Sequence, residues 1–268
     1  MTRDNAIVQV TGRYFHNIRV AQPSDKGCMH VNVSGNLDHP FYADWYFAPH
    51  LQQAGYTVGI FGKHLNGDNP ACPPPGVDRW FANGGGNFFS PSFSWASAGV
   101  EPSSAHFANC TYNNGSCYST SVIANQSLAW LAEMHSLPAA ERKPYFAYIA
   151  VKAPHIQDGP GWPVTLAAPW YEDAFPGLQA PRTPNWNASC PDHHWMIRTQ
   201  PPMTEEQAMH SDDLYRHRFQ SLLSVDDMVE GVVGAVEAME DAKNTYFIFT
   251  SGPLPSPPRP PWLTQKAF

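Results

Sequence analysis

The sequence has few cysteines, little positive charge and no long apolar run. Its five cysteines in 268 residues are scattered, so disulfides alone cannot organise a fold of this size. Lysine and arginine number 16 against 23 aspartates and glutamates, and a net charge of -7 argues against a nucleic-acid partner or an anionic membrane surface. No segment is apolar over the length that a membrane span requires. We therefore expect a partner that is neither nucleic acid nor lipid.

Several common catalytic patterns are also missing. The sequence contains no glycine-rich phosphate loop and no Ser-His-Asp order. His193 and His194 are neighbours, but no second cluster at zinc-ligand spacing accompanies them. No set of carboxylates gathers near the predicted strand ends. For hydrolysis, the nucleophile is the missing part.

Acceptor sequons for N-glycosylation favour the secretory pathway. An intracellular protein with reduced thiols remains the alternative, and the N-terminal residues show no signal peptide, so the chain is either intracellular or lacks its true beginning. Cys110 and Cys117 could close a small disulfide loop, and the odd number of cysteines leaves at least one thiol unpaired or intermolecular. The five sequons begin at Asn32, Asn109, Asn114, Asn125 and Asn187.

The chain alternates predicted helices with apolar segments that have the character of buried strands. A long amphipathic helix is predicted over residues 212–241, from apolar side chains at helical spacing. Alternation of this kind favours an α/β fold with a parallel or mixed sheet that helices cover on both faces. Residues 66–118 read as surface loops that could include short strands, and residues 156–210 read as loops. The other predicted elements are a short helix before a turn at Gly55, strands at 57–61, 145–151 and 245–250, and a helix at 119–134.

Ligands of such sheets gather beyond the carboxyl ends of the strands. Lys63 and His155 each follow a predicted strand, and together they would form a cationic pocket for a tetrahedral oxyanion. The alternative is a surface lysine and a capping histidine. A third strand end is predicted at residues 250–252.

Three further groups are weaker candidates. His64 lies beside Lys63 in a predicted turn, where a histidine is often only solvated. Trp195 could stack on a sugar ring or fill a core. Asp226 and Asp227 resemble an acid/base pair, but adjacent helical positions point about 100° apart, so we expect one buried and one solvated carboxylate and no catalysis.

Taken together, several stretches resemble the sulfatase family, in particular its N-acetylglucosamine-6-sulfatase branch and the algal and fungal arylsulfatases. The order and spacing of these stretches agree with the family over most of residues 9–251. They are "TGRYFHN", "LQQAGYTVGIFGKHLNG", "VKAPH", "APRTPNWN", "HHWMIRTQPPMT", "RFQSLLSVDDMVEGVV" and "NTYFIFTS".

The resemblance implies an alkaline-phosphatase-like α/β fold and hydrolysis of sulfate esters, with a sulfated glycan or an aryl sulfate as the substrate. The family uses a formylglycine made from the cysteine of a Cys-x-Pro-Ser-Arg motif, and a calcium ion that polarises the sulfate. It also implies that Lys63 binds the sulfate and that His155 neutralises its oxygens and protonates the leaving alcohol. His64 is out of register with the family's pattern. A lysosomal or extracellular location is implied as well.

The departures from the family are at both ends. Counting back from Arg13 places the nucleophile at Thr2, which cannot become formylglycine. Gly252 and Pro253 stand where the family has metal-binding residues, and the strand with two further metal ligands is absent. We thus expect no formylglycine, no calcium ligands and no activity in this chain. Residues 1–251 would form a partial catalytic domain of low stability and 252–268 a disordered proline-rich tail.

Two alternatives to an enzyme remain open on the sequence. The chain could be a non-catalytic protein that binds sulfated glycans through Lys63, His155 and aromatic-rich loops with Trp80, Trp95 and Trp195. It could also be a truncated product without a function of its own.

Overall fold

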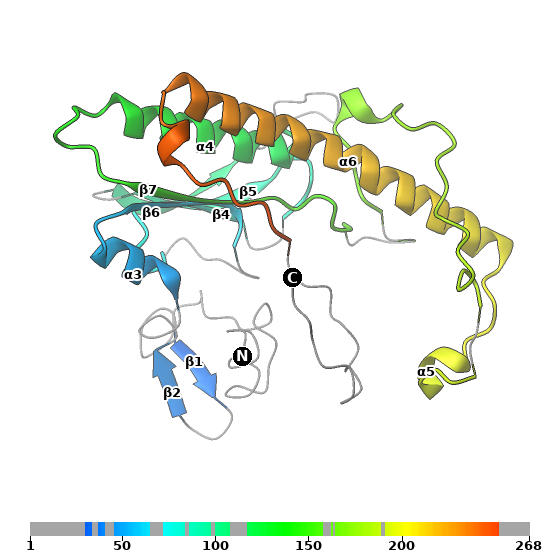
Figure 1. The fold of residues 1–268 in the computed structure, drawn as a ribbon. Coiled ribbons are helices and arrows are strands. Elements are labelled where there is room, and N and C mark those ends of the chain that lie inside the picture. The colour runs from blue at the N-terminus through cyan, green and yellow to red at the C-terminus, as the bar shows by residue number, and fades with distance from the viewer. Residues whose placement is uncertain are drawn as a thin grey trace.

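A five-stranded mixed sheet with the strand order β6-β5-β4-β3-β7 forms the centre of the fold (Figure 1). Strand β3 pairs in parallel with both β4 and β7, whereas β4, β5 and β6 are joined by antiparallel pairing. The strands are β3 (Thr57–Lys63), β4 (Arg79–Asn83), β5 (Ser92–Ser97), β6 (Val100–His106) and β7 (Tyr145–Ala150). The computed structural model describes residues 30–33, 37–40, 46–64, 72–83, 86–97, 100–107, 117–157, 162, 164–188 and 191–251.

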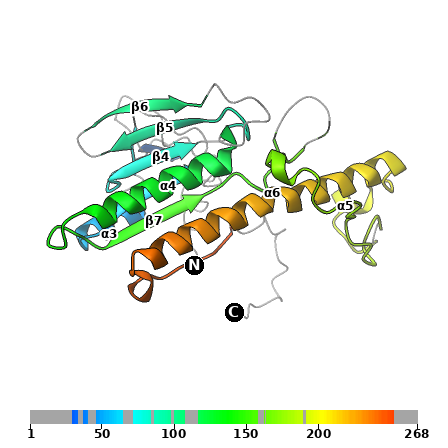
Figure 2. The ribbon, with the colours of Figure 1, turned by 90° about the horizontal axis from the view of Figure 1, so that it is seen from above.

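Helices cover both faces of this sheet. The helices α4 (Ser119–Ser136) and α6 (Glu205–Ala238) lie side by side on one face, and α3 (Phe47–Gln53) lies on the other (Figures 1 and 2). The predicted α/β class is therefore confirmed. Within the described part of the chain, no helix is both long enough and apolar enough to cross a membrane. The smaller elements are β1 (His30–Val33), β2 (Leu37–Pro40), η3 (Pro169–Tyr171), α5 (Trp195–Arg198) and η4 (Ala242–Asn244).

The core lies between the sheet and the pair α4 and α6. Trp130 of α4 is buried and its ring centroid lies 5.5 Å from that of Phe61 in β3. The predicted apolar stripe of α6 supplies Val225 and Val236 to this core, because helical spacing places them on one face. Val229, which the same stripe includes, is 38% exposed, and Met228 is the buried residue at that level.

The prediction for residues 66–118 allowed for short strands without locating them, and β4, β5 and β6 all lie there. Their aromatic side chains are core residues, and the rings of Phe81 and Phe93 stack 4.2 Å apart across β4 and β5. Residues 92–95 alternate polar and apolar side chains, which is the period of a strand. That signal was hidden by the glycines and prolines around it.

Helix α6 begins at Glu205, earlier than the predicted start at residue 212. Thr204 and Gln207 form a capping box, in which each side chain accepts a hydrogen bond from the other residue's backbone N–H. The pattern Thr-Glu-Glu-Gln was a readable start signal. The polar first turns of the helix carry no apolar stripe, so periodicity alone placed the start too late.

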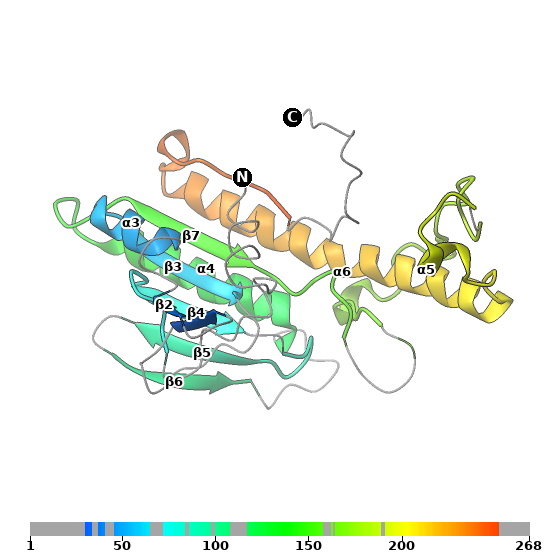
Figure 3. The ribbon, with the colours of Figure 1, turned by 90° about the horizontal axis from the view of Figure 1, so that it is seen from below.

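The strand predicted over residues 245–250 does not form. After η4 the chain runs back alongside α6 without pairing to a described strand (Figures 1, 2 and 3). Tyr246, Ile248 and Phe249 are 94%, 82% and 82% exposed. The preference of a residue for β-structure reflects the packing of its side chain against neighbouring strands. This segment has no such neighbour on the described sheet. Residues 252–268, predicted as a tail, lie outside the described residues.

Candidate functional site

The carboxyl ends of β3 and β7 meet at one edge of the sheet (Figure 3). Gly62 of β3 is opposite Ala150 of β7, and Lys63 is opposite Asn83 of β4. His155 follows in the segment after β7. The structure therefore brings the two strand ends that carry Lys63 and His155 side by side, as the parallel arrangement predicts.

Gly62 allows this close approach. Its φ of 89° lies in the left-handed region, and a Cβ atom built there would lie 1.9 Å from the carbonyl oxygen of Ala150. The same atom would lie 2.8 Å from Cδ1 of Ile123 in α4. A side chain at this position would push β3 away from its neighbour just before Lys63.

His155 lies exposed on a loop that a buried threonine holds in place. The Oγ1 atom of Thr165 lies 3.3 Å and 3.2 Å from the carbonyl oxygens of Pro154 and His155 and donates to them. The ring of His155 donates from Nδ1 to the Ile156 carbonyl at 2.6 Å. This leaves Nε2 as the atom that can face a ligand, as an acceptor when the imidazole is neutral and as a donor when it is charged.

Lys152 is a further cation at this edge, and the sequence analysis did not single it out. It lies just after β7, where its Nζ donates to the Gly86 carbonyl and approaches the ring centroid of Phe88 at 5.1 Å. Gln157 holds the same segment, since its Oε1 accepts from the Phe88 backbone N–H at 3.0 Å. These contacts fix the chain beside the strand ends. Its position directly after the apolar segment 145–151 was the available signal.

The other candidates lie differently. Nε2 of His64 is 2.9 Å from the Tyr46 hydroxyl, and the two rings meet edge to face, so this histidine packs against the start of α3. Trp195 is 59% exposed at the start of α5. In all three ribbon views α5 lies beyond the sheet, apart from the ends of β3 and β7. The structure thus does not bring Trp195 to Lys63 and His155.

The aspartate pair of α6 differs from its prediction. Asp226 and Asp227 are both exposed, so the expectation of one buried carboxylate was wrong. The hydroxyl of Tyr171 donates to the two carboxylate oxygens of Asp227 at 2.8 and 2.9 Å, and this raises the pKa of Tyr171. The pair links the η3 turn to the helix. This contact between Tyr171 and Asp227 lies in the helical layer of the fold and not at the carboxyl ends of the strands.

The stretch "APRTPNWN" has a structural role in this fold. The guanidinium of Arg182 binds both carboxylate oxygens of Asp212 at 2.8 and 2.6 Å, and it lies 4.1 Å from the Trp186 ring. The hydrogen bonds from Arg182 hold the pKa of Asp212 below its ordinary value, with a further contribution from the Ala180 backbone N–H. These bonds attach the segment to the first half of α6.

The described residues do not fit a calcium site. No group of three or more histidine, cysteine, aspartate or glutamate side chains in this part of the chain is arranged to hold a metal ion. Thr2, Gly252 and Pro253, where the resemblance places the nucleophile and metal-binding positions, lie outside the described residues. The missing calcium ligands and formylglycine therefore remain predictions.

The two cysteines in the part of the chain that the structure describes, Cys72 and Cys117, are both disulfide-bonded. Cys110 lies outside the described residues, so its predicted pairing with Cys117 stays a prediction. Asn125 is an exposed residue of α4. Asn187 bonds the Met203 backbone through its amide, which accepts at 2.5 Å and donates at 3.4 Å. Of the remaining sequons, Asn32 lies in β1, and Asn109 and Asn114 lie outside the described residues.

The sulfatase family model matches residues 8–260, and the chain belongs to the sulfatase family. N-acetylglucosamine-6-sulfatase of Bos taurus is 30% identical over 259 residues, a match that covers 90% of this chain and 40% of that protein. The extracellular sulfatase SULF-1 homolog of Drosophila melanogaster is 30% identical over 243 residues, which cover 90% of this chain and 20% of that protein.

More distant relatives cover the same region. The arylsulfatase of Volvox carteri is 25% identical over 280 residues and matches 89% of this chain and 40% of its own length. One solved structure, a complex with its substrate D-glucosamine-2-N,6-O-disulfate, is 16% identical, covers 91% of this chain and 54% of that chain, and superposes with a TM-score of 0.49. The chain spans two fifths or less of the length of these three curated relatives.

Proposed function

We propose that this chain belongs to a lineage of sulfuric ester hydrolases that act on N-acetylglucosamine 6-sulfate units of glycosaminoglycans or on aryl sulfates. Two relatives at 30% and 25% identity are named for these substrates. The observation that supports the proposal is that the carboxyl ends of β3 and β7 meet, because Lys63 is the last residue of β3 and His155 follows β7 along the chain. A lysine supplies a compact positive charge and a histidine a directional donor, which suits a sulfate group.

We further propose that this chain does not turn over a sulfate ester. Formylglycine would supply the nucleophile and calcium would polarise the sulfate, but Thr2, Gly252 and Pro253 stand at the positions that the resemblance assigns to these functions. Loss of a nucleophile or of charge-stabilising groups typically costs orders of magnitude in rate. Lys63 and His155 would then hold a sulfate without activating a nucleophile against it.

The purified chain is expected to release no sulfate from 4-methylumbelliferyl sulfate or from N-acetylglucosamine 6-sulfate above the uncatalysed background, with or without added calcium. The reason is the absent nucleophile rather than weak binding. Fluorescence of the released phenol and ion chromatography of sulfate measure the two reactions, with an active sulfatase as the positive control. Calcium-dependent release that scales with the concentration of the chain would contradict the proposed inactivity.

A non-catalytic sulfated-glycan binder is the second candidate function, and the exposed ring of His155 at the strand ends favours it. Heparan sulfate is expected to bind the chain at low salt. Lys63→Ala should weaken this binding by about three- to tenfold, which corresponds to losing roughly 0.7–1.4 kcal/mol of interaction. The affinity should also fall as salt is added, because exposed charges are screened.

Lys143→Ala provides the matched control for this experiment. Lys143 is exposed and precedes β7, so it lies toward the opposite edge of the sheet from Lys63. Equal losses for the two variants would indicate non-specific attraction by net charge. No binding at low salt by a chain that melts cooperatively would exclude the binder, and a chain without a cooperative melt would instead favour a truncated product without independent function.

The same proposal places the chain in the secretory pathway, in a lysosome or outside the cell. The disulfides at Cys72 and Cys117 support this, because disulfides persist in oxidising compartments. The name of the Drosophila relative gives an extracellular location for that protein. The exposed sequon at Asn125 is compatible with glycosylation in that pathway.

A further inference from the structure

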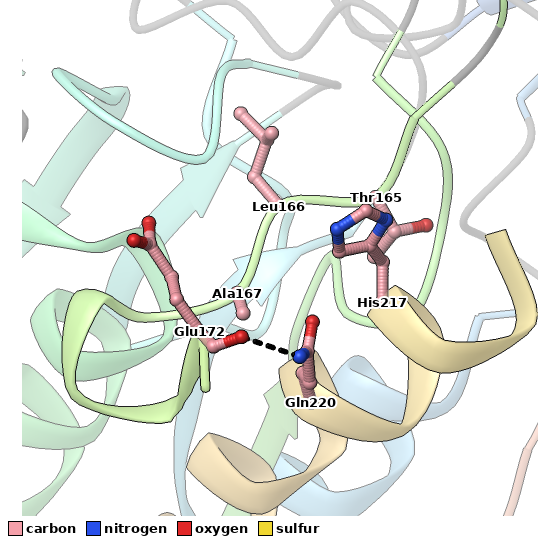
Figure 4. Close-up of a pocket in the computed structure, with 6 residues that line it drawn as sticks. All are labelled: Thr165, Leu166, Ala167, Glu172, His217 and Gln220. Carbon is pink, nitrogen blue, oxygen red and sulfur yellow. Dashed lines mark hydrogen bonds between the residues drawn. The ribbon is translucent and has the colours of Figure 1, made fainter. Parts of the chain in front are cut away.

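A cavity of about 230 Å³ lies between α6 and the segment that precedes and includes η3 (Figure 4). Gln220 in its wall is buried, and its Nε2 donates to the carbonyl oxygens of Glu172 and Ala174 at 2.6 and 2.8 Å. These bonds attach the turn after η3 to the helix, so the cavity belongs to the packing of this turn. The larger unexplained feature of the molecule lies after the end of α6.

Residues 246–249, which we call the apolar run, follow η4 and present large side chains to solvent. Tyr246, Ile248 and Phe249 are largely exposed, and Phe247 between them is half-exposed. The run and the two residues after it include no charged residue and no proline, which are the residues that discourage strand pairing. Aromatic and β-branched residues favour β-structure when a neighbouring strand is present. The run is therefore suited to pairing with the edge of a sheet.

Strand β7 has an edge of this kind. In the part of the chain that the structure describes, β7 pairs only with β3. The Thr57 backbone N–H donates to the Pro144 carbonyl at 2.8 Å, so the carbonyl just before β7 points toward β3. Because the backbone groups of successive strand residues alternate in direction, those of Tyr145, Ala147 and Ile149 point away from β3. Their N–H donors and C=O acceptors lie along an edge that no described strand covers.

The opposite edge of the sheet is protected against pairing. Its strand β6 has the sequence VEPSSAH, in which Glu101 adds a charge and Pro102 lacks a backbone N–H. Strand β7, with the sequence YFAYIA, has neither a charged residue nor a proline. A further strand is therefore expected to add at β7 and not at β6.

The run of the same copy does not pair with this edge, because the turn before it is fixed. The Thr245 backbone N–H donates to the Ala242 carbonyl at 3.2 Å, and its hydroxyl donates to the Asp241 carbonyl at 2.9 Å. The carboxylate of Asp241 lies 3.8 Å from Nδ1 of His135 in α4, and Ala242 packs against the core. The run then continues alongside α6 (Figures 2 and 3). The edge of a second copy is under no such constraint.

We propose that the apolar run of one copy adds as an edge strand to β7 of a second copy, and that the second copy does the same in return. An exchange of this kind is isologous, so it closes at two copies. Residues 246–251 match the length of β7, which has 6 residues. Because an aromatic side chain buries about 150–250 Å², the two runs together would bury roughly 1,000 Å² or more. This area is close to the lower limit of about 1,200 Å² for a stable interface. The proposal does not rest on the proposed function.

Native mass spectrometry of two variants, alone and mixed, tests the exchange. Ala147→Pro removes an outward N–H of β7 at an edge position where proline is tolerated, and Ile248→Ser with Phe249→Ser removes the run. Each variant alone is expected to be monomeric at a concentration where the parent is dimeric. Their mixture should form a heterodimer, because the run of the first variant can still pair with the edge of the second. With one contact instead of two, its dissociation constant should be at least about tenfold higher than that of the parent dimer.

Two results of this experiment would overturn the exchange. If Ala147→Pro alone associates as strongly as the parent, the run contacts a surface other than the edge of β7. If two folded variants form no heterodimer when mixed, or if the parent itself stays monomeric, the run of one copy does not pair with the edge of another.

Hydrogen exchange of the parent chain gives a second measurement that needs no variant, since a proline in β7 can also unfold the strand. The amides of Tyr145, Ala147 and Ile149 and those of the apolar run should exchange at least about tenfold more slowly at the concentration that forms the dimer than in dilute solution. The unpaired amides of β6, at the protected edge, are the control and should exchange equally at both concentrations. Protection of the run without protection of β7 would show a contact between the two runs and overturn the exchange.

Discussion

Gly62→Ala is expected to lower the free energy of unfolding by about 4 kcal/mol or more, a loss that single substitutions rarely reach. The added Cβ would lie 1.9 Å from the Ala150 carbonyl oxygen, which belongs to the paired backbone of β7 and cannot rotate away. Relief requires β3 and β7 to separate at the edge where Lys63 begins. Urea unfolding followed by tryptophan fluorescence measures the change, and Trp130 in the core is a suitable reporter.

Gly55→Ala is the matched control for this substitution. Gly55 has a φ of 88°, almost the same as the 89° of Gly62, but nothing lies within 4 Å of its ideal Cβ. The control therefore includes the left-handed strain of an alanine, roughly 1–2 kcal/mol, without the steric clash. The difference between the two variants isolates the contact between the strands. Equal destabilisation would show that the close approach of β3 and β7 at Gly62 does not form in solution.

The elements with clear periodicity were predictable from the sequence. Helix α4 and strands β3 and β7 have apolar patterns, and these patterns were sufficient to predict that the carboxyl ends of β3 and β7, which precede the two candidate residues, lie side by side. The positions of strands β4 to β6 were not predicted, because these strands depend on contacts between different strands, such as the stack of Phe81 on Phe93. Local propensity does not report such contacts.

Candidate sites, like strands, can be predicted from the sequence only where they depend on local features. Lys63 is readable because a strand end is a local feature of the sequence. The cavity beside Gln220 is not, since it depends on a turn at residues 172–174 that lies far from α6 in sequence. His217 and Gln220 look like ordinary polar positions of an amphipathic helix. Only the folded chain shows that Gln220 is buried and that its amide donates to the carbonyl oxygens of Glu172 and Ala174.

The double substitution Ile248→Ser with Phe249→Ser is expected to reduce self-association of the chain strongly. These two side chains are each 82% exposed and stand beside Tyr246, which is 94% exposed, so they form a continuous apolar run on the surface. Burying a side chain of this size is worth roughly 1.5–3 kcal/mol, so the run favours contact with a second copy. Size-exclusion chromatography with light scattering measures the apparent mass against protein concentration.

The sheet gives a second reason to expect association through this region. Strand β7 pairs only with β3 among the described strands, so its other edge carries backbone groups that a second chain could pair with. Val229→Ser, at a single apolar position 38% exposed on α6, serves as the control and should leave the apparent mass unchanged. If the double variant associates as strongly as the parent, the apolar run is not the contact, and the edge of β7 becomes the surface to test. If the parent chain stays monomeric at high concentration, neither the apolar run nor the edge of β7 mediates association. Residues 246–249 would then be covered in solution by another part of the chain.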